Sequence, residues 1–139
     1  MYKNIMVPVD LRHLDRLGKA LKTAADLARQ YGAQVCYVGV TAETPGALAH
    51  NPREYAAKLA DFAAAQSAEH GIETTSKPLA SHDPAIDLDH TLRDAAEEIG
   101  ADLVVMATHM PNITDYIWPS HGGRLATHSD ASVFLVRGG

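Results

Sequence analysis

Short apolar runs rich in β-branched residues alternate along this chain with longer segments whose apolar residues recur at helical spacing. The short runs, which predict β-strands, cover residues 5–9, 35–40, 72–79, 103–106 and 133–136. The helical patterns between them cover residues 17–28, 55–63, 84–99 and 120–128. Strands that alternate with helices are joined by right-handed crossovers and form a parallel sheet. The alternation therefore predicts an α/β fold, with a five-stranded parallel sheet and helices on both of its faces.

Glycine and proline residues mark the ends of the predicted helices. Gly32, Gly71 and Gly100 each follow a helical pattern and are typical of helix stops. Pro84 predicts the start of the third helix, because proline has no amide to lose in a first helical turn. Residues 42–52 contain further proline and glycine and are predicted to form a loop.

Length, charge and cysteine content exclude several classes of protein. The chain has 139 residues, which fits one domain over residues 1–139. Its formal net charge is −5 and its lysines and arginines form no basic run, so we expect no nucleic-acid partner. No apolar run approaches the roughly 18 residues of a membrane span, and the first residues do not resemble a signal peptide. We therefore expect no membrane insertion. The single cysteine, Cys36, suits a reducing compartment, so we expect a cytoplasmic protein.

Ligands of open parallel sheets bind outside the carboxyl ends of the strands, at the point where the strand order reverses. The segments that meet this condition are residues 8–10, residues 39–41 and the chain from Met106 onward. Asp10 ends the first strand, and its carboxylate can accept hydrogen bonds from ribose hydroxyls or hold a cation; the alternative is a turn residue or a helix cap. Ser120 begins the last predicted helix. Its hydroxyl and the amides of the first helical turn can bind phosphate; the alternative is simple capping.

Metal binding and hydrolytic catalysis find little support in the sequence. His121 and His128 share a predicted helix face, but their α-carbons lie about 10.5 Å apart at the helical rise per residue, too far for one zinc ion. His109 lies at the mouth of the predicted site, where it either forms a structural hydrogen bond or contacts a ligand. There is no Ser-His-Asp order, nucleophile elbow, HExxH motif or cysteine cluster. We therefore expect no metal site and no catalytic residue, and we leave a slow enzymatic activity open.

Three stretches of the chain carry a family resemblance. Residues 3–10 read Lys-Asn-Ile-Met-Val-Pro-Val-Asp, and residues 100–109 read Gly-Ala-Asp-Leu-Val-Val-Met-Ala-Thr-His. Residues 109–137 contain a His-x-Pro motif, followed by Ser120, and end in Val-Phe-Leu-Val-Arg. These stretches resemble the first strand, the fourth strand and the carboxyl-terminal signature of the universal stress protein family. The likeness covers essentially the whole chain, and its carboxyl-terminal part is the most specific.

The resemblance implies a Rossmann-like domain that takes part in stress survival or regulation, and many members of the family bind ATP. It implies that residues 8–10, Val40 beside the adenine, and the end of the fourth strand contact the nucleotide. The candidate nucleotide-binding residues are Pro8, Val9, Asp10, Val40, Met106, Ala107, His109, Met110, Ser120 and His121. The resemblance also implies a homodimer through the last strand. The residues expected to meet their copies antiparallel are Val133, Phe134, Leu135 and Val136.

The predicted phosphate loop departs from the pattern of the family. Where binding members have glycine, then glycine or arginine, and then glycine before a serine or threonine, this chain has Ala107, Met110, Pro119 and Ser120. Only Ser120 matches. Pro119 has no amide to give to a phosphate, and Met110 supplies no positive charge. We therefore expect ATP or AMP to bind weakly, with the contacts to adenosine better kept than those to phosphate.

The resemblance leaves three functions to be separated. The leading one is a stress-response or regulatory protein with a degenerate adenine-nucleotide site, which acts by binding and interaction. The second keeps true ATP binding and adds slow ATP hydrolysis or phosphate transfer. The third is a regulatory partner of a transporter or kinase that binds no ligand.

Overall fold

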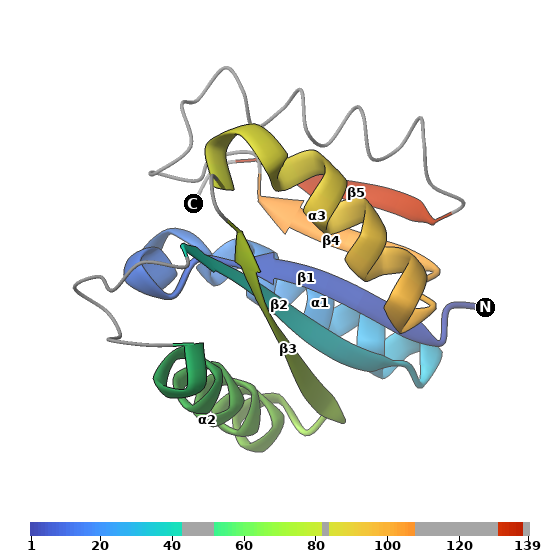
Figure 1. Cartoon of the computed structure of the whole chain (residues 1–139). Coiled ribbons are helices and arrows are strands. Elements are labelled where there is room, and N and C mark those ends of the chain that lie inside the picture. Colours follow the sequence, from blue (N-terminus) through green and yellow to red (C-terminus); the bar gives the residue numbers. More distant parts are fainter. Residues whose placement is uncertain (43–51, 82–83, 108–130, 138–139) are drawn as a thin grey trace.

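One sheet of five parallel strands forms the centre of the molecule. The computed structural model describes residues 1–42, 52–81, 84–107 and 131–137 of the chain. The strands are ordered β3-β2-β1-β4-β5, and every neighbouring pair is parallel (Figure 1). Their bounds are Asn4–Val9 for β1, Gln34–Ala42 for β2, Thr74–Ser81 for β3, Leu103–Ala107 for β4 and Ser132–Val136 for β5. The predicted α/β fold with a five-stranded parallel sheet is confirmed.

Helices cover both faces of this sheet. Their bounds are Gly18–Tyr31 for α1, Pro52–His70 for α2 and Pro84–Ile99 for α3. Right-handed crossovers place α1 and α2 on one face and α3 on the other, because the chain runs from β1 to β3 in one direction and then crosses back to β4. Figure 1 shows α1 behind the sheet and α3 in front of it. The helix expected over residues 120–128 lies outside the described residues. None of the helices that the structure describes is long and apolar enough to cross a membrane.

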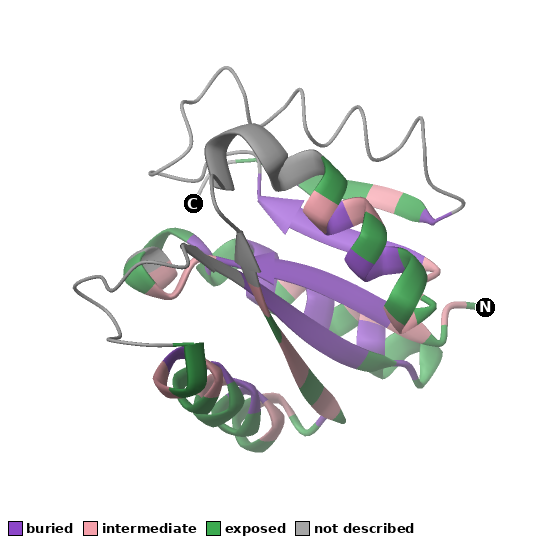
Figure 2. Ribbon diagram, viewed as in Figure 1, coloured by how far each residue is buried: buried purple, intermediate pink, exposed green. Residues whose placement is uncertain are grey.

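Two of the three inner strands of the sheet, β1 and β4, are buried along their length, from Ile5 in β1 and from Leu103 in β4 (Figure 2). Strands that are covered on both faces read as continuous apolar runs, which is why these two were easily predicted. The edge strands β3 and β5 are largely half-buried or exposed, and β3 accordingly has few apolar residues.

The predicted helix stops are confirmed by their backbone conformation. Gly32, Gly71 and Gly100 have φ angles of 64°, 64° and 72°, in the left-handed region that favours glycine. At the end of α1, the amides of Gly32 and Ala33 both donate hydrogen bonds to the carbonyl oxygen of Ala28. These bonds satisfy the last turn of the helix and direct the chain into β2.

Several limits differ from the prediction, and β3 (Thr74–Ser81) begins and ends two residues later than the predicted run over 72–79. β2 continues to Ala42, because its last residues pair with the end of β3. α2 begins at Pro52, which had been assigned to the preceding loop, and the first position of a helix is one where proline fits without cost. A 3-10 helix, η1 (Leu11–Arg16), follows β1 and had not been predicted.

Candidate functional site

The strand order reverses between β1 and β4, which puts the candidate site at the carboxyl ends of these two strands. From β1 the chain builds β2 and β3 on one side of the sheet, and it then returns to build β4 and β5 on the other. The last paired residues of β1 and β4 are Met6 and Val104, and both strands continue beyond this pair, to Val9 and Ala107. Such a reversal is where open α/β sheets bind their ligands.

The predicted site residues on the strands lie at this end of the sheet, with their side chains in the core. Val9, Met106 and Ala107 are at most 4% exposed, and Pro8 is buried as well. What these residues offer to a ligand at the end of the sheet is therefore their main-chain groups. Val40 lies near the carboxyl end of the neighbouring strand β2, and its side chain is outside the described part of the structure.

Asp10 follows β1 directly and caps η1. Its Oδ1 accepts a hydrogen bond from the backbone amide of Arg12 at 3.0 Å and lies 3.4 Å from Arg12 Nε. The alternative role as a helix cap is thus confirmed. The side chain of Asp10 is nevertheless 14% exposed and that of Arg12 54% exposed, so the ion pair reaches the surface at the end of β1. An ionised carboxylate only accepts hydrogen bonds, so further partners at this place must be donors such as hydroxyls, or cations.

Four of the predicted site residues belong to the segment that follows β4. They are His109, Met110, Ser120 and His121, and they lie outside the described residues, as does Pro119. The structure therefore brings together the parts of the predicted site that come from β1, β2 and β4.

Tyr55 belongs to the same region, although its sequence pattern indicated only a helix face. It lies in the first turn of α2 and is 3% exposed. Its ring packs over Gly39 of β2, where an added Cβ would lie 2.3 Å from the Tyr55 hydroxyl oxygen. A glycine inside a strand often marks a close approach of another group, so Gly39 was the signal in the sequence for this contact.

The phenol of Tyr55 lies within the electrostatic influence of Asp10. Burial raises the pKa of Tyr55 to about 12, with a further raising effect from the negative charge of Asp10 and a lowering effect from the positive charge of Arg12. A phenol with this pKa stays neutral at physiological pH. Asp10, Arg12 and Tyr55 thus form one electrostatic neighbourhood at the carboxyl end of β1.

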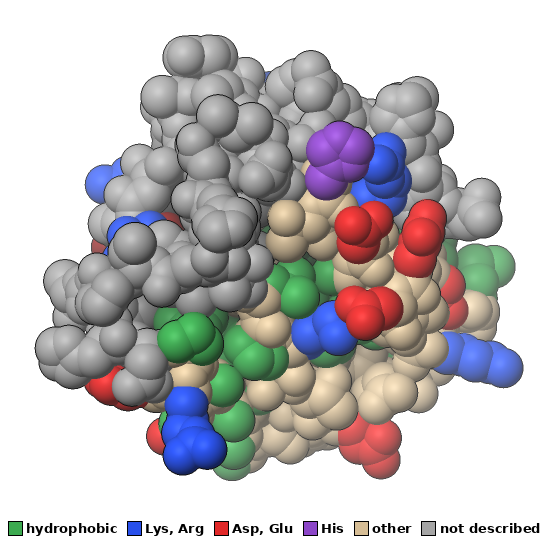
Figure 3. Space-filling view, in the orientation of Figure 1, with side chains coloured by type: hydrophobic (Ala, Val, Ile, Leu, Met, Phe, Trp, Pro, Cys, Tyr) green, Lys and Arg blue, Asp and Glu red, His purple; other side chains and the backbone are tan. Residues whose placement is uncertain are grey.

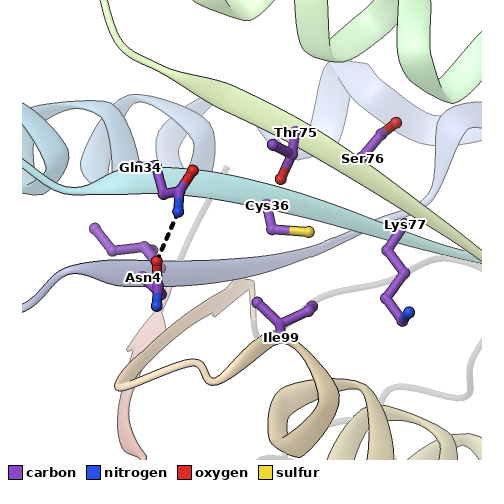
Figure 4. Close-up of a pocket in the computed structure, with 8 residues that line it drawn as sticks. Asn4, Gln34, Cys36, Thr75, Ser76, Lys77 and Ile99 are labelled. Carbon is purple, nitrogen blue, oxygen red and sulfur yellow. Dashed lines mark hydrogen bonds between the residues drawn. The ribbon is translucent and has the colours of Figure 1, made fainter.

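A cavity of about 260 Å³ lies toward the other end of the sheet, between the strands and α3 (Figure 4). Several of its polar side chains pair with one another or with α3. Gln34 Nε2 donates to Asn4 Oδ1 at 2.9 Å, and Lys77 Nζ lies 3.3 Å from a carboxylate oxygen of Glu98. Cys36 borders this cavity at 7% exposure, as expected of a core residue, and burial raises the pKa of its thiol. The thiol is therefore protonated and weakly reactive at neutral pH.

Acidic side chains gather over α3 on the same face of the molecule (Figure 3). Asp94, Glu97 and Glu98 belong to the described part of this helix, as do His90 and Arg93, whose side chains lie 2.7 Å apart. Among the described residues, no group of three or more histidine, cysteine, aspartate or glutamate side chains is placed to hold a metal ion. Asp94, Glu97 and Glu98 are exposed, so the charge on α3 belongs to a solvated helix face.

Comparison with known proteins agrees with the geometry of the sheet. The sequence model of the universal stress protein family matches residues 1–137. This chain belongs to the universal stress protein family. The match includes β1, β4 and β5, whose sequences carried the resemblance, and also α2, where the likeness was one of pattern alone.

Relatives of this universal stress protein match it over nearly the whole of both chains. Universal stress protein G of Salmonella typhimurium is 28% identical over 148 residues, covering 99% of this chain and 100% of that protein. A universal stress protein family member from Burkholderia pseudomallei has a crystal structure with a TM-score of 0.68 and 28% identity, covering 97% and 96% of the two chains. The universal stress protein of Archaeoglobus fulgidus in complex with dAMP has a TM-score of 0.66 and 21% identity, covering 96% and 97% of the two chains, and shows a common fold.

Proposed function

We propose that this chain is a stress-response or regulatory protein that binds an adenine nucleotide weakly and acts through binding and interaction. The observation that carries this proposal is the position of Asp10, a partly exposed carboxylate at the end of β1 where the strand order reverses. A carboxylate at this point of an open α/β sheet is suited to the hydroxyls of a ribose. The family membership and the dAMP complex of the Archaeoglobus fulgidus protein, which has the same fold, support an adenine nucleotide as the class of ligand.

The adenosine end of the ligand would lie across β1, β2 and β4. Asp10 would accept hydrogen bonds from the ribose, and Val40 would lie beside the adenine. The buried residues Val9, Met106 and Ala107 would contribute main-chain groups, since their side chains are in the core. These contacts need no charge on the ligand, so adenosine itself should occupy the same place.

The phosphate end of the ligand would depend on Arg12 and on the segment after β4. The Arg12 guanidinium lies beside Asp10 and reduces the repulsion between this carboxylate and a phosphate. His109, Met110, Ser120 and His121 are the candidate residues of the segment. Few phosphate contacts are expected from it, because glycines of the family pattern are replaced and the residue before Ser120 is a proline without an amide. We therefore propose little preference for ATP over AMP.

Calorimetric titration of adenosine, AMP and ATP tests this function. Asp10→Asn keeps a side-chain oxygen that caps η1 but removes the charge. A hydrogen bond to a charged group is worth about 1 kcal/mol more than a neutral one, so the affinity for AMP and for adenosine should fall roughly fivefold. Asp102→Asn is the matched control, because Asp102 also accepts backbone amides, from Lys3 and Asn4 at 2.8 and 3.1 Å, but lies before β4 at the opposite end of the sheet.

Each outcome of these titrations has a definite meaning. An unmodified chain that binds none of the three compounds at millimolar concentration would contradict the proposed function and favour a partner protein without a ligand. Equal losses in both aspartate variants would show a general effect on folding instead of a contact at Asp10. Low-micromolar binding of ATP with much weaker binding of AMP would show that the phosphate loop works, and that weak binding was the wrong expectation.

We also propose that β5 forms the interface of a homodimer. Among the described residues, this strand lies at the edge of the sheet and pairs with β4. Phe134 and Leu135 are 45% and 40% exposed there, although both are large apolar side chains. An edge strand presents unpaired backbone groups that readily pair with another chain. Antiparallel pairing of two copies around a two-fold axis would complete both edges and cover these side chains.

A reducing compartment such as the cytoplasm is the location that we propose for this dimer. Cys36 is the single cysteine of the chain and lies buried in β2 as a free thiol. Free buried thiols are typical of proteins that fold where disulfides do not form.

A further inference from the structure

Tyr55 fills a notch in β2 that exists because residue 39 has no side chain. A Cβ on Gly39 would lie 2.3 Å from the hydroxyl oxygen of Tyr55 and 3.1 Å from two of its ring carbons. The first of these separations is far inside van der Waals contact, so no larger residue fits at position 39 while Tyr55 keeps this place. The contact therefore fixes the first turn of α2 against the carboxyl half of β2.

The notch lies next to the residues proposed to hold the nucleoside. Gly39 is the register partner of Val9, the residue that precedes Asp10, and Val40 follows Gly39 in the same strand. Tyr55 is 3% exposed, and its phenol is subject to the charges of Asp10 and Arg12. A shift of this ring would therefore change the surroundings of Asp10.

We propose that Tyr55 is a positioning residue for the nucleoside end of the site: seated on Gly39, its phenol holds the first turn of α2 at a set distance from the end of β1, which Asp10 follows. This inference rests on the proposed nucleotide binding. It assigns Tyr55 no contact with the phosphate. Loss of the hydroxyl should consequently weaken the binding of adenosine and of AMP by the same factor.

Tyr37 provides a matched control for a merely structural role. It lies in the same strand as Gly39, is fully buried, and packs edge-on against Phe62 of α2 at 5.1 Å between ring centroids. Burial raises the pKa of Tyr37 to about 12, with a further contribution from Glu69 where Tyr55 has Asp10. Both tyrosines thus bury a phenol between β2 and α2, but of the two only Tyr55 is coupled to Asp10.

The test is titration of adenosine and AMP into the unmodified protein, Tyr55→Phe and Tyr37→Phe, with thermal unfolding of all three. Tyr55→Phe removes the atom that lies nearest to Gly39, so it should lower both affinities by the same factor of about three to ten. Tyr37→Phe should leave both affinities unchanged even where it shifts the unfolding midpoint as much as Tyr55→Phe does.

Gly39→Ala tests the notch itself. Its Cβ should displace the phenol and lower both affinities in the natural background. The Tyr55→Phe background lacks the hydroxyl that the added Cβ would meet, so the same substitution should cost less affinity there. Such non-additivity is expected of two residues in direct contact.

Several results would overturn the proposal. They are unchanged affinities in Tyr55→Phe, an equal loss in Tyr37→Phe, or a loss for AMP without one for adenosine. Additive effects of Gly39→Ala and Tyr55→Phe would likewise contradict it. If the unmodified protein binds neither compound, this inference and the proposed function fall together; if it binds both and Tyr55→Phe binds them equally well, only this inference falls.

Discussion

Tyr37 and Tyr55 place two ionisable phenols in the layer between the sheet and α2. They are 0% and 3% exposed, and burial raises the pKa of each to about 12. Burial disfavours the charged phenolate, so the folded protein keeps both protons well above the pH at which an exposed tyrosine loses its own. The unfolded chain, by contrast, releases these protons near pH 10.

The free energy of unfolding should therefore fall as the pH rises through this interval. The folded pKa is the higher one, so the stabilisation is complete below about pH 10 and is lost as the pH approaches about 12. With about 1.4 kcal/mol for each pKa unit, each phenol contributes up to about 2–3 kcal/mol to this loss. Urea denaturation at a series of alkaline pH values should show a shallower decline in a Tyr37→Phe/Tyr55→Phe variant. An equal decline in both proteins would contradict the assignment.

At the scale of residues, the sequence was sufficient to predict the position and the cap role of Asp10, but not the contact of Tyr55 with Gly39. Asp10 ends a strong apolar run, so both its place at the end of β1 and its alternative role as a cap followed from local pattern. Tyr55 sits at helical spacing with apolar neighbours, and such a pattern does not tell a ring over a strand end from any other core ring. Its contact with Gly39 depends on how α2 packs on β2, which is a property of the tertiary structure.

At the scale of elements, α1 shows how the position of a glycine decides its effect. Gly18 begins the helix and Gly32 follows it. A Cβ would meet no atom within 4 Å at either residue, so sterically both sites are open. The difference lies in the backbone, because only Gly32 of these two has a positive φ, of 64°.

Alanine at these two positions should shift stability in opposite directions. Gly32→Ala is expected to lower the free energy of unfolding by about 1–2 kcal/mol, since a side chain is strained in the left-handed region. Gly18→Ala is expected to raise it by up to about 1 kcal/mol through better helix propensity. Chemical denaturation of the two variants checks both signs. A stabilising Gly32→Ala would show that this helix ends differently in solution.

The elements that were predicted best are those with one dominant physical cause. β1 and β4 are buried on both faces, so their apolar runs were unambiguous. The limits of β2 and α2 were less exact, because pairing with the end of β3 and the tolerance of Pro52 in a first turn are decided outside the local pattern. η1 was missed because a 3-10 segment of 6 residues is too short to show a periodic pattern of apolar residues.

At the scale of the whole molecule, the position of β5 at the edge of the described sheet predicts assembly. We expect light scattering to give a dimer at tens of micromolar, and Phe134→Glu to give a monomer, because a charge on the paired edge has to be desolvated in the interface. Ala64→Glu is the matched control, since residue 64 is exposed on α2 and belongs to another element. A monomeric natural protein, or equal dissociation by both substitutions, would contradict an interface at β5.

The position of β1 in the middle of the sheet also has a consequence for synthesis. β2 follows it almost at once, but β4, its other neighbour, is made only after α3, and the bond from the Asn4 amide to Asp102 joins residues 98 positions apart. On the ribosome, the first three strands therefore emerge while one edge of β1 still lacks its neighbour. Such long-range pairing is slow, and an unpaired strand edge is a template for association between nascent chains. The protein should consequently depend most on chaperones in the interval before residue 107 leaves the exit tunnel.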